Sequence, residues 1–388
     1  MMFWFGPSFV RFLRNSVVLG TMLAVAFGSL RGGSRPPETI RIGIMTETAS
    51  VTMGPGAFLV REGADGKEHR LSWGDKFEVR VAGHGVLLGT KLLSGPVVVQ
   101  PLTPDAFPIL NGRSYHGGLE FRRAPSGRLT VINELPLDDY VKGILIHETS
   151  PVWPFEALKV QAVISRSYAL NTRGRHGKEG YDLCDEIHCQ VYGGRDSERE
   201  IPNRAVEETR GEVLTHEGKI IKAVFHSCCG GSTENSENIW EGPALPYLKA
   251  VRCRWCRRSP RYKWVAEVRL DSAARKLAAG GSDVGNIRML RVLSRSRSGR
   301  AYRVRVAGSK GAAELSANAF RILLDGRVVR STFWTAVSQT RDSWRFDGKG
   351  WGHGVGLCQW GTKAMADAGR NYKTILHYYY RNVKLERR

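Results

Sequence analysis

The chain has 388 residues, 42% of them hydrophobic, so it can bury one large core or two modest ones. Its 16 Pro and 44 Gly are typical of a turn-rich fold and are too few for a disordered chain. The 58 Lys and Arg against 37 Asp and Glu give a net charge of +21. This charge predicts an anionic partner, which nucleic acid, an acidic membrane surface or an acidic wall polymer would satisfy.

The N-terminus indicates export. Residues 16–30 form an uncharged run with the length of a signal-peptide core, too short for a comfortable membrane span. Ala24 and Ala26 give the A-x-A arrangement of a signal peptidase site. We interpret residues 1–34 as a signal peptide, or as an uncleaved anchor, with its junction. Both alternatives place the remainder in the periplasm or cell wall and make nucleic acid a poor partner. Membrane contact is expected only through residues 16–30, and only if this segment stays uncleaved.

Short β-branched runs separated by turn residues follow from residue 40 and predict strands. The predicted strands are residues 40–45, 77–82 and 86–89, with a hairpin over 119–131. Beyond residue 230 we predict strands at 263–270, 289–294 and 302–307, a short helix at 272–279, and a last helix at 361–368. Residues 291–305 are expected to form a solvated basic hairpin.

Two helices are predicted between these strand-rich parts. Leu137, Val141, Ile144 and Glu148 recur at steps of three and four residues, which is typical of an amphipathic helix. A Pro-rich turn ends this helix, and a second helix runs from residue 155 to about 172. The fold class is therefore α+β: a strand-rich mixed fold with a helix pair near residues 137–172.

Glu148 continues the apolar face of the first helix. Burying a carboxylate costs several kcal/mol unless the group is paired or protonated, and desolvation raises its pKa. A neutral carboxylic acid is what glycosidic cleavage needs, because the leaving oxygen must be protonated. The spacing equally allows a helix-end carboxylate paired with Lys159 or Arg166.

The second helix carries two polar stripes, because residues seven apart share a face. Lys159 and Arg166 form one stripe, and Gln161 and Tyr168 form the other. These side chains could face Glu148 and bind sugar hydroxyls and carboxylates. A solvated helix face explains them equally well.

Glycine stands at every second position of residues 350–356, which predicts a C-terminal strand with one bare face. Trp351 and His353 would share the opposite face, with Gln359 close behind. The bare face would admit either a sugar ring or a neighbouring backbone.

The seven cysteines form two local groups and leave Cys358 apart. His176, Cys184 and Cys189 offer a mixed nitrogen and sulfur ligand set suited to zinc, and zinc and disulfide both remain open there. The second group could also hold zinc, but export favours disulfides. Its members are Cys228, Cys229, Cys253 and Cys256.

Three ordered blocks of the sequence resemble the SpoIID/LytB family of bacterial sporulation and cell-wall proteins. The blocks are residues 135–148 with 153–170; 189–193 with 209–211, 226–231 and 246–248; and 350–361 with 375–380. The resemblance divides the mature chain into a β-rich region at 38–115 and a catalytic domain at 116–388, which includes a basic β-rich segment near 260–340.

The resemblance implies a lytic transglycosylase, which breaks the β-1,4 bond between N-acetylmuramic acid and N-acetylglucosamine and leaves a 1,6-anhydro end. Glycan strands stripped of stem peptides are the expected substrate, and the family's catalytic glutamate matches Glu148. One carboxylate suffices because the substrate's own 6-hydroxyl attacks, unlike the two-carboxylate hydrolases. The candidate substrate-binding residues are Lys159, Gln161, Arg166, Tyr168, Gln190, Tyr192, Trp351, His353 and Gln359.

No cofactor is required for this chemistry. The resemblance also implies a zinc ion, with His176, Cys184 and Cys189 where its ligands would lie. The sequence departs from the family's commoner pattern at Cys229, Cys253, Cys256 and Cys358. An alternative function is a non-catalytic, wall-binding activator of an N-acetylmuramoyl-L-alanine amidase, for which the amidase would be the partner.

Overall fold

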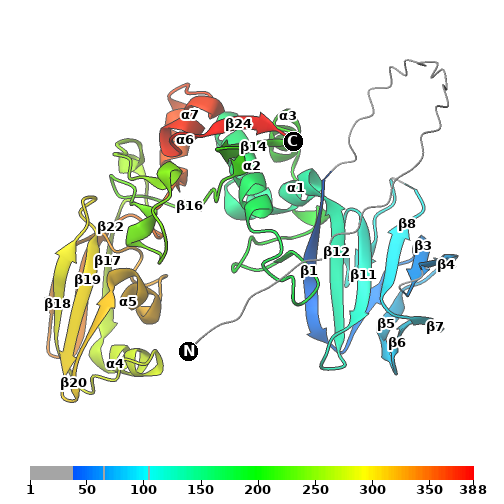
Figure 1. Ribbon diagram of the computed structural model, residues 1–388, viewed down its shortest axis with the longest axis horizontal. Coiled ribbons are helices and arrows are strands. Elements are labelled where there is room, and N and C mark those ends of the chain that lie inside the picture. The colour runs from blue at the N-terminus through cyan, green and yellow to red at the C-terminus, as the bar shows by residue number, and fades with distance from the viewer. Residues whose placement is uncertain (1–37, 64–65, 104) are drawn as a thin grey trace, which may run out of the picture. The chain divides into compact units, whose positions relative to one another are not determined.

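The computed structural model describes residues 38–388 except 64, 65 and 104, and Figure 1 shows its elements. The predicted signal peptide or anchor within residues 1–34 lies outside the described residues. No helix in the described part of the chain is both long and apolar enough to cross a membrane.

Two sheets form the N-terminal part of the described chain. The first has the order β13 (Leu183–Cys184), β1 (Thr39–Thr48), β12 (Leu129–Pro136), β11 (Gly118–Arg123), β8 (Val97–Pro101), β3 (Gly56–Glu62) and β4 (Lys67–Trp73). The second has the order β10 (Arg113–Ser114), β9 (Ile109–Leu110), β2 (Ser50–Met53), β5 (Phe77–Ala82), β6 (Gly85–Leu88) and β7 (Lys91–Ser94).

The predicted N-terminal strands and the hairpin are confirmed, but the first sheet crosses the proposed boundary at residue 116. β1 pairs with β12, and β8 pairs with β11, so strands from both sides of that boundary share one sheet. Turn residues mark where hairpins form, whereas they carry no information about which distant strands pair. The boundary therefore separates no independent core.

The helix pair consists of α1 (Leu137–Glu148) and α2 (Phe155–Asn171), close to the predicted limits. α2 is buried on nearly every side, because it contributes to two hydrophobic cores. Ala162 and Ala169 belong to the core beneath the first sheet. Val160, Val163 and Ile164 belong to a second core. α3 (Glu200–Glu208), which was not predicted, also contacts α1 and α2.

The second core lies among short strands and two C-terminal helices. β14 (Glu212–His216) pairs with β15 (Lys219–Ile220) and β24 (Lys384–Arg387), and β16 (Phe225–His226) pairs in parallel with β23 (Leu357–Cys358). α6 (Gln359–Asp367) corresponds to the predicted last helix. A further helix follows it, α7 (Tyr372–Tyr379), whose N-terminus is capped by Asn371. The predicted helix therefore exists, but the prediction that it is the last helix of the chain is wrong.

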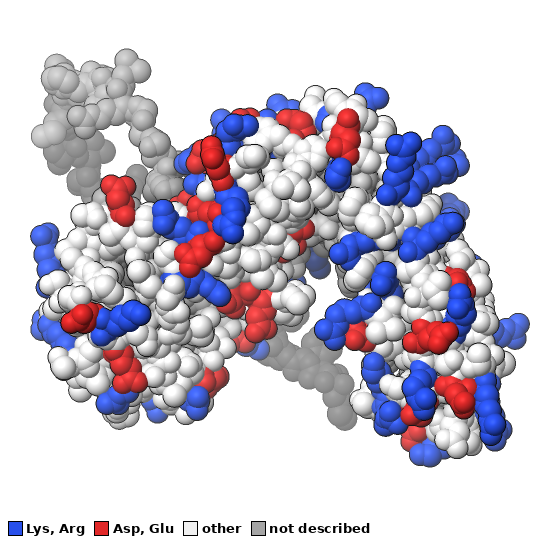
Figure 2. Space-filling view, turned by 180° about the vertical axis from the view of Figure 1, so that it is seen from behind, with Lys and Arg blue, Asp and Glu red and all other residues white. Residues whose placement is uncertain are grey.

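The basic segment, residues 251–350, has a third core. Its elements are β17 (Lys263–Arg269), α4 (Leu270–Ala279), β18 (Ile287–Arg295), β19 (Ala301–Gly308), β20 (Gly311–Ser316), α5 (Ala317–Leu324), β21 (Trp334–Gln339) and β22 (Ser343–Lys349). It holds 23 Lys and Arg against 7 Asp and Glu, and so carries most of the net charge. Figure 2 shows many of these cationic side chains at its right-hand side.

The predicted strand over residues 350–356 is wrong. Gly350, Gly352, Gly354 and Gly356 all have positive φ, between 71° and 110°, which no β-strand adopts. The close backbone approach is nevertheless real: a Cβ atom added at Gly356 would lie 2.2 Å from the carbonyl oxygen of Val224. The glycines therefore allow an irregular backbone to lie directly against β16 and its neighbours.

Candidate functional site

Glu148 is the last residue of α1 and opens into a pocket of about 680 Å³. Its side chain is partly buried, with one face towards the pocket. The other walls come from segments that are far apart in the sequence. They include Tyr168, Arg175, His188, Cys189, Gln190, Lys222, Phe225, Trp240 and His353.

The environment of Glu148 favours a protonated carboxyl group. Burial raises its pKa to about 7, although a hydrogen bond from the Val191 main chain acts in the opposite direction. Glu148 is the one carboxylic acid among the described residues that line this pocket. It is therefore placed to donate a proton near neutral pH, with no second carboxylate opposite it.

Gln359 fixes the main chain of Glu148 from α6. Its Nε2 donates a hydrogen bond of 2.7 Å to the Glu148 carbonyl oxygen. The same nitrogen lies 3.3 Å from Oε1 of Gln161, which is itself buried on α2. Gln161 and Gln359, both predicted as substrate-binding residues, thus support the catalytic candidate from behind.

Aromatic and cationic groups cover other parts of the pocket. Arg175 lies at one side, where its Nη1 donates to the His188 carbonyl oxygen at 2.7 Å. Lys222 Nζ lies 5.6 Å from the centre of the Trp240 ring. Flat aromatic faces and two cations in one pocket suit a sugar chain that carries carboxylates.

His353 reaches the pocket as a neutral imidazole. Nδ1 accepts a hydrogen bond of 3.1 Å from the Val355 N–H, so the proton is on Nε2, which donates to the Phe225 carbonyl oxygen at 2.9 Å. Burial lowers its pKa to about 4. With both nitrogens engaged, His353 forms a fixed wall next to Trp240, at 5.0 Å between ring centres. Tyr168 and Gln190, which we expected to bind substrate, also line the pocket.

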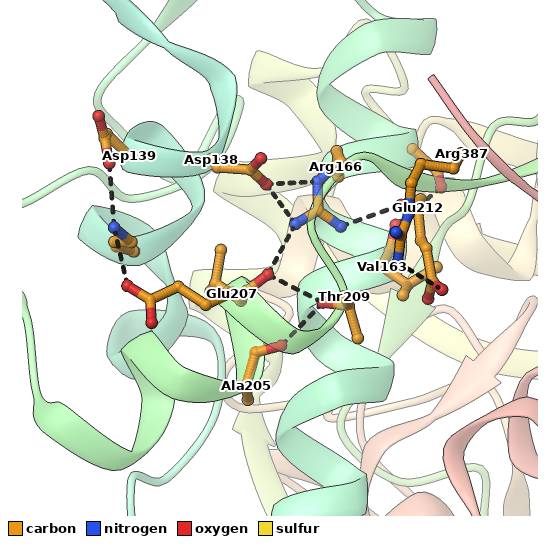
Figure 3. Close-up of polar contacts among 12 residues, drawn as sticks. Asp138, Asp139, Val163, Arg166, Ala205, Glu207, Thr209, Glu212 and Arg387 are labelled. Carbon is orange, nitrogen blue, oxygen red and sulfur yellow. Dashed lines mark hydrogen bonds and ion pairs between the residues drawn. The ribbon is translucent and has the colours of Figure 1, made fainter. Parts of the chain in front are cut away.

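Lys159 and Arg166 lie outside the described lining of the pocket, and neither pairs with Glu148. Lys159 pairs with Glu156 at 3.2 Å and with Glu208 of α3 at 2.7 Å. Arg166 is fully buried, pairs with Asp138, and donates to the Glu212 carbonyl oxygen at 2.9 Å, as Figure 3 shows. The seven-residue spacing correctly predicted that Lys159 and Arg166 share one face of α2. This face contacts α3, which the sequence did not predict.

Tyr192 and Trp351 also lie away from the described pocket lining. Tyr192 is buried, and its hydroxyl donates to Oδ1 of Asn133 at 2.8 Å. Trp351 contacts two guanidinium groups, those of Arg261 at 4.1 Å and Arg330 at 4.5 Å from its ring centre. The expected common face of Trp351 and His353 does not form, because the segment is not a strand.

The structure adds pocket residues that the sequence analysis missed. Arg175, Lys222, Phe225 and Trp240 come from loops or from a two-residue strand. Such segments have no periodicity that would indicate which way a side chain points. A neighbouring helix or sheet, and not the local pattern, brings them to Glu148.

A group of metal-ligating side chains borders the pocket, and we term it the rim cluster: His176, Cys184, His188 and Cys189. One nitrogen or sulfur of each lies within 4.8 Å of all the others. Cys189 Sγ is 3.5 Å from His176 Nε2 and 3.6 Å from His188 Nδ1. Two imidazoles with two thiols are a donor set that zinc favours, so these residues fit the expected ion. His188 was not among the predicted ligands, although it stands between the two cysteines.

All seven cysteines are free thiols in the structure. The disulfides predicted among Cys228, Cys229, Cys253 and Cys256 are not formed. Cys358, distant in sequence, joins the last three of these, and the four sulfurs lie within 4.8 Å of one another. Cys229 Sγ and Cys256 Sγ are 3.3 Å apart, well beyond a disulfide bond of about 2.0 Å, so the fold groups the thiols without pairing them.

Comparison with known proteins matches the SpoIID family, described as Stage II sporulation protein, to residues 125–216. A domain of unknown function (DUF8618) matches residues 254–356, a range that includes the segment near 260–340 that we expected to be basic and β-rich.

Three relatives resemble the chain over most of its length. An uncharacterised protein of Brachyspira hyodysenteriae is 35% identical over 73% of this chain and 75% of its own. The stage II sporulation protein D of Bacillus amyloliquefaciens is 30% identical over 66% of this chain and 75% of its own. The amidase enhancer of Bacillus subtilis is 30% identical over 63% of this chain but only 40% of its own length. With the three sequence blocks and the pocket built from them, these matches show that the chain belongs to the SpoIID/LytB family.

Proposed function

We propose that the chain is an exported lytic transglycosylase, which cleaves the β-1,4 bond between N-acetylmuramic acid and N-acetylglucosamine in peptidoglycan glycan strands. The observation that carries this proposal is a single carboxylic acid, Glu148, in an open pocket where burial raises its pKa to about 7. A hydrolase of the two-carboxylate type needs a second acid across the cleft. The described lining offers none.

The reaction needs only one group that both gives and takes a proton. Glu148 first donates its proton to the glycosidic oxygen, and the bond from that oxygen to the muramic acid C1 breaks. The carboxylate then removes the proton of the 6-hydroxyl on the same sugar, and its oxygen bonds to C1 to form the 1,6-anhydro ring. Glu148 is protonated again at the end, and no water is consumed.

The cations of the pocket favour strands without stem peptides. Removal of the peptide leaves the lactyl group of muramic acid as a free carboxylate. Arg175 and Lys222 line the same pocket as Glu148 and could bind such a carboxylate by charge-assisted hydrogen bonds. The excess of Lys and Arg in the basic segment would hold the protein on an anionic wall polymer.

A zinc ion on the rim cluster would have a supporting role. It would tie the loop that carries His188 and Cys189 to β13, whose last residue is Cys184. Cys189 and the following Gln190 both line the pocket, so the rim cluster would fix this wall. Proton transfer at Glu148 needs no metal.

Incubation of purified protein with denuded glycan strands, followed by mass spectrometry, tests the proposal. We expect fragments with 1,6-anhydro ends from the wild type and none from Glu148→Gln, which should keep its fold by circular dichroism and still bind glycan. Reducing-end fragments without the anhydro ring would instead indicate a hydrolase.

The amidase-enhancer relative favours one alternative, a wall-binding activator of an amidase. The same preparation should then be mixed with a cell-wall amidase and intact peptidoglycan. Stimulated release of stem peptides, with no anhydro product from denuded strands, would replace our proposal by the activator function.

A further inference from the structure

A second group of thiols lies in the second core, away from the described pocket lining. We term it the buried cysteine cluster: Cys229, Cys253, Cys256 and Cys358. Cys229 follows β16, Cys253 and Cys256 lie at the short helix η4 (Trp255–Arg258), and Cys358 ends β23. All four side chains are at most 1% exposed. Three distant segments thus bring their sulfurs to one point.

We propose that the buried cysteine cluster holds one structural zinc ion as a tetrathiolate. A tetrahedron with zinc–sulfur bonds of about 2.3 Å has sulfur–sulfur edges of about 3.8 Å. The four sulfurs lie within 4.8 Å of one another, and Cys229 Sγ is 3.3 Å from Cys256 Sγ. A four-iron cluster would need them further apart, because each sulfur binds a different iron. The spacing therefore fits one ion.

The charge beside the cluster supports an anionic centre. Arg300 is fully buried, and its Nη2 donates to the carbonyl oxygens of Cys229 and Ser232. Its Nε and Nη1 have no hydrogen-bond partner among the described residues, and no ion pair with a described residue includes it. A guanidinium stays charged, so burying it unpaired is costly.

A zinc tetrathiolate would supply the missing counter-charge. One Zn²⁺ with four thiolates has two net negative charges, and Cys229, Cys228 and Cys358 are the cysteines whose charge would act on Arg300. Glu234 acts on it as well. That carboxylate, however, makes its hydrogen bonds with Asn235, Asn238, Ser296 and Ser298.

The surroundings of the sulfurs are those of thiolate ligands. Cys358 is the N-cap of α6, and its Sγ accepts hydrogen bonds from the main-chain N–H groups of Cys229 at 3.2 Å and Gly361 at 3.3 Å. The Tyr379 hydroxyl lies 3.3 Å from Cys253 Sγ. Donors of this kind and a helix N-terminus both stabilise a negative sulfur.

Zinc binding here is a proton exchange without a redox step. Each of the four S–H groups loses its proton to solvent as its sulfur bonds to Zn²⁺. The ion would join β16, η4 and the start of α6. Gln359, the residue after Cys358, donates to the Glu148 carbonyl oxygen, so the ion would also fix the support of Glu148.

Cys228 provides a matched control. It is as buried as its neighbour Cys229, but it does not belong to the group of four sulfurs that are mutually close. Its main chain pairs with Trp351, with hydrogen bonds of 2.7 and 3.1 Å. Its thiol contacts those of Cys256 and Cys358, so a serine at this position removes a buried thiol beside the cluster and leaves the four proposed ligands intact.

The proposal is tested by the zinc content of the full chain, which is measured after gel filtration by inductively coupled plasma mass spectrometry. We expect Cys256→Ser to contain one zinc ion fewer per chain than the wild type, and Cys228→Ser to match the wild type. Equal zinc in all three proteins, or iron in place of zinc, would overturn the proposal.

A second measurement covers the case that Cys256→Ser does not fold. A chain with Cys184→Ser and Cys189→Ser, which disable the rim cluster, is loaded with Co²⁺. We expect the visible and near-ultraviolet bands of a tetrahedral centre with sulfur ligands only. Bands that indicate nitrogen ligands, absence of cobalt, or a mapped Cys253–Cys256 disulfide in the native wild type would overturn the tetrathiolate.

Discussion

The pocket beside Glu148 and the buried cysteine cluster differ in their exposure to solvent and in their side chains. They are nevertheless linked by two consecutive residues of the chain. The pocket has an open volume of about 680 Å³, with charged and aromatic walls. The cysteine cluster is closed to solvent. Cys358 belongs to the cluster and Gln359 supports Glu148. Glu148 keeps one face open to the pocket, whereas the thiols of the buried cysteine cluster, which are also reactive groups, are enclosed by the core.

Replacing Glu148 should change the cleavage rate more than any other substitution and should leave stability unchanged. Glu148→Gln removes the proton donor and acceptor, so the rate of anhydro-end formation should fall by about 10²–10⁴-fold. The melting temperature should not decrease, since the amide needs no proton to remain neutral in this buried position. A rate loss accompanied by unfolding in thermal denaturation would break the distinction between the two regions.

Arg166 should show the opposite behaviour. Arg166→Met leaves Asp138 without its buried partner, so the free energy of unfolding should decrease by about 3–5 kcal/mol. The matched change Lys159→Met breaks ion pairs to more exposed carboxylates and should cost about 1 kcal/mol or less. Urea unfolding measures both. Similar losses in the two variants would show that the buried pair has no special weight.

The pH dependence of cleavage should report the raised pKa of Glu148 in the pocket. Because burial raises the pKa of Glu148 to about 7, its acid form is present below that pH and is lost as pH rises through it. The rate should therefore fall about tenfold per pH unit above 7. Initial rates on denuded glycan between pH 3 and 9 would show this limb, and a rate that already falls from about pH 4.5 would contradict the effect of burial.

Gln359 should give the smallest effect and tests the link between the regions. Gln359→Ala removes a hydrogen bond to the Glu148 carbonyl oxygen, which is worth about 1 kcal/mol, so the rate should fall about fivefold. Gln359→Asn shortens the side chain and should not restore the bond. An unchanged rate in both variants would mean that α6 does not support Glu148.

Local patterns predicted the elements better than the site. Periodicity placed α1, α2 and many strands within a few residues, and it put Glu148 on a buried face. It failed at residues 350–356, where alternating glycines have positive φ instead of extended backbone. It also placed Arg166 in the site, because a helical stripe does not say which element it meets.

The composition of the two cysteine groups was equally incomplete. His188 and Cys358 complete groups whose other members were recognised from short spacings. Cys358 is more than 100 residues beyond Cys256, so only the tertiary fold brings their sulfurs together. Pairwise disulfides were the natural expectation from the sequence, whereas the fold assembles four thiols.

The position of α2 has a consequence for how the molecule unfolds. Because this helix supplies side chains to the core beneath the first sheet and to the core around the cysteines, neither core can melt without exposing apolar surface of the other. These two parts should therefore open as one cooperative unit in hydrogen exchange. The third core, in the basic segment, does not include α2, so its amide hydrogens can exchange through a separate opening. Partial opening there would leave the helices around Glu148 protected.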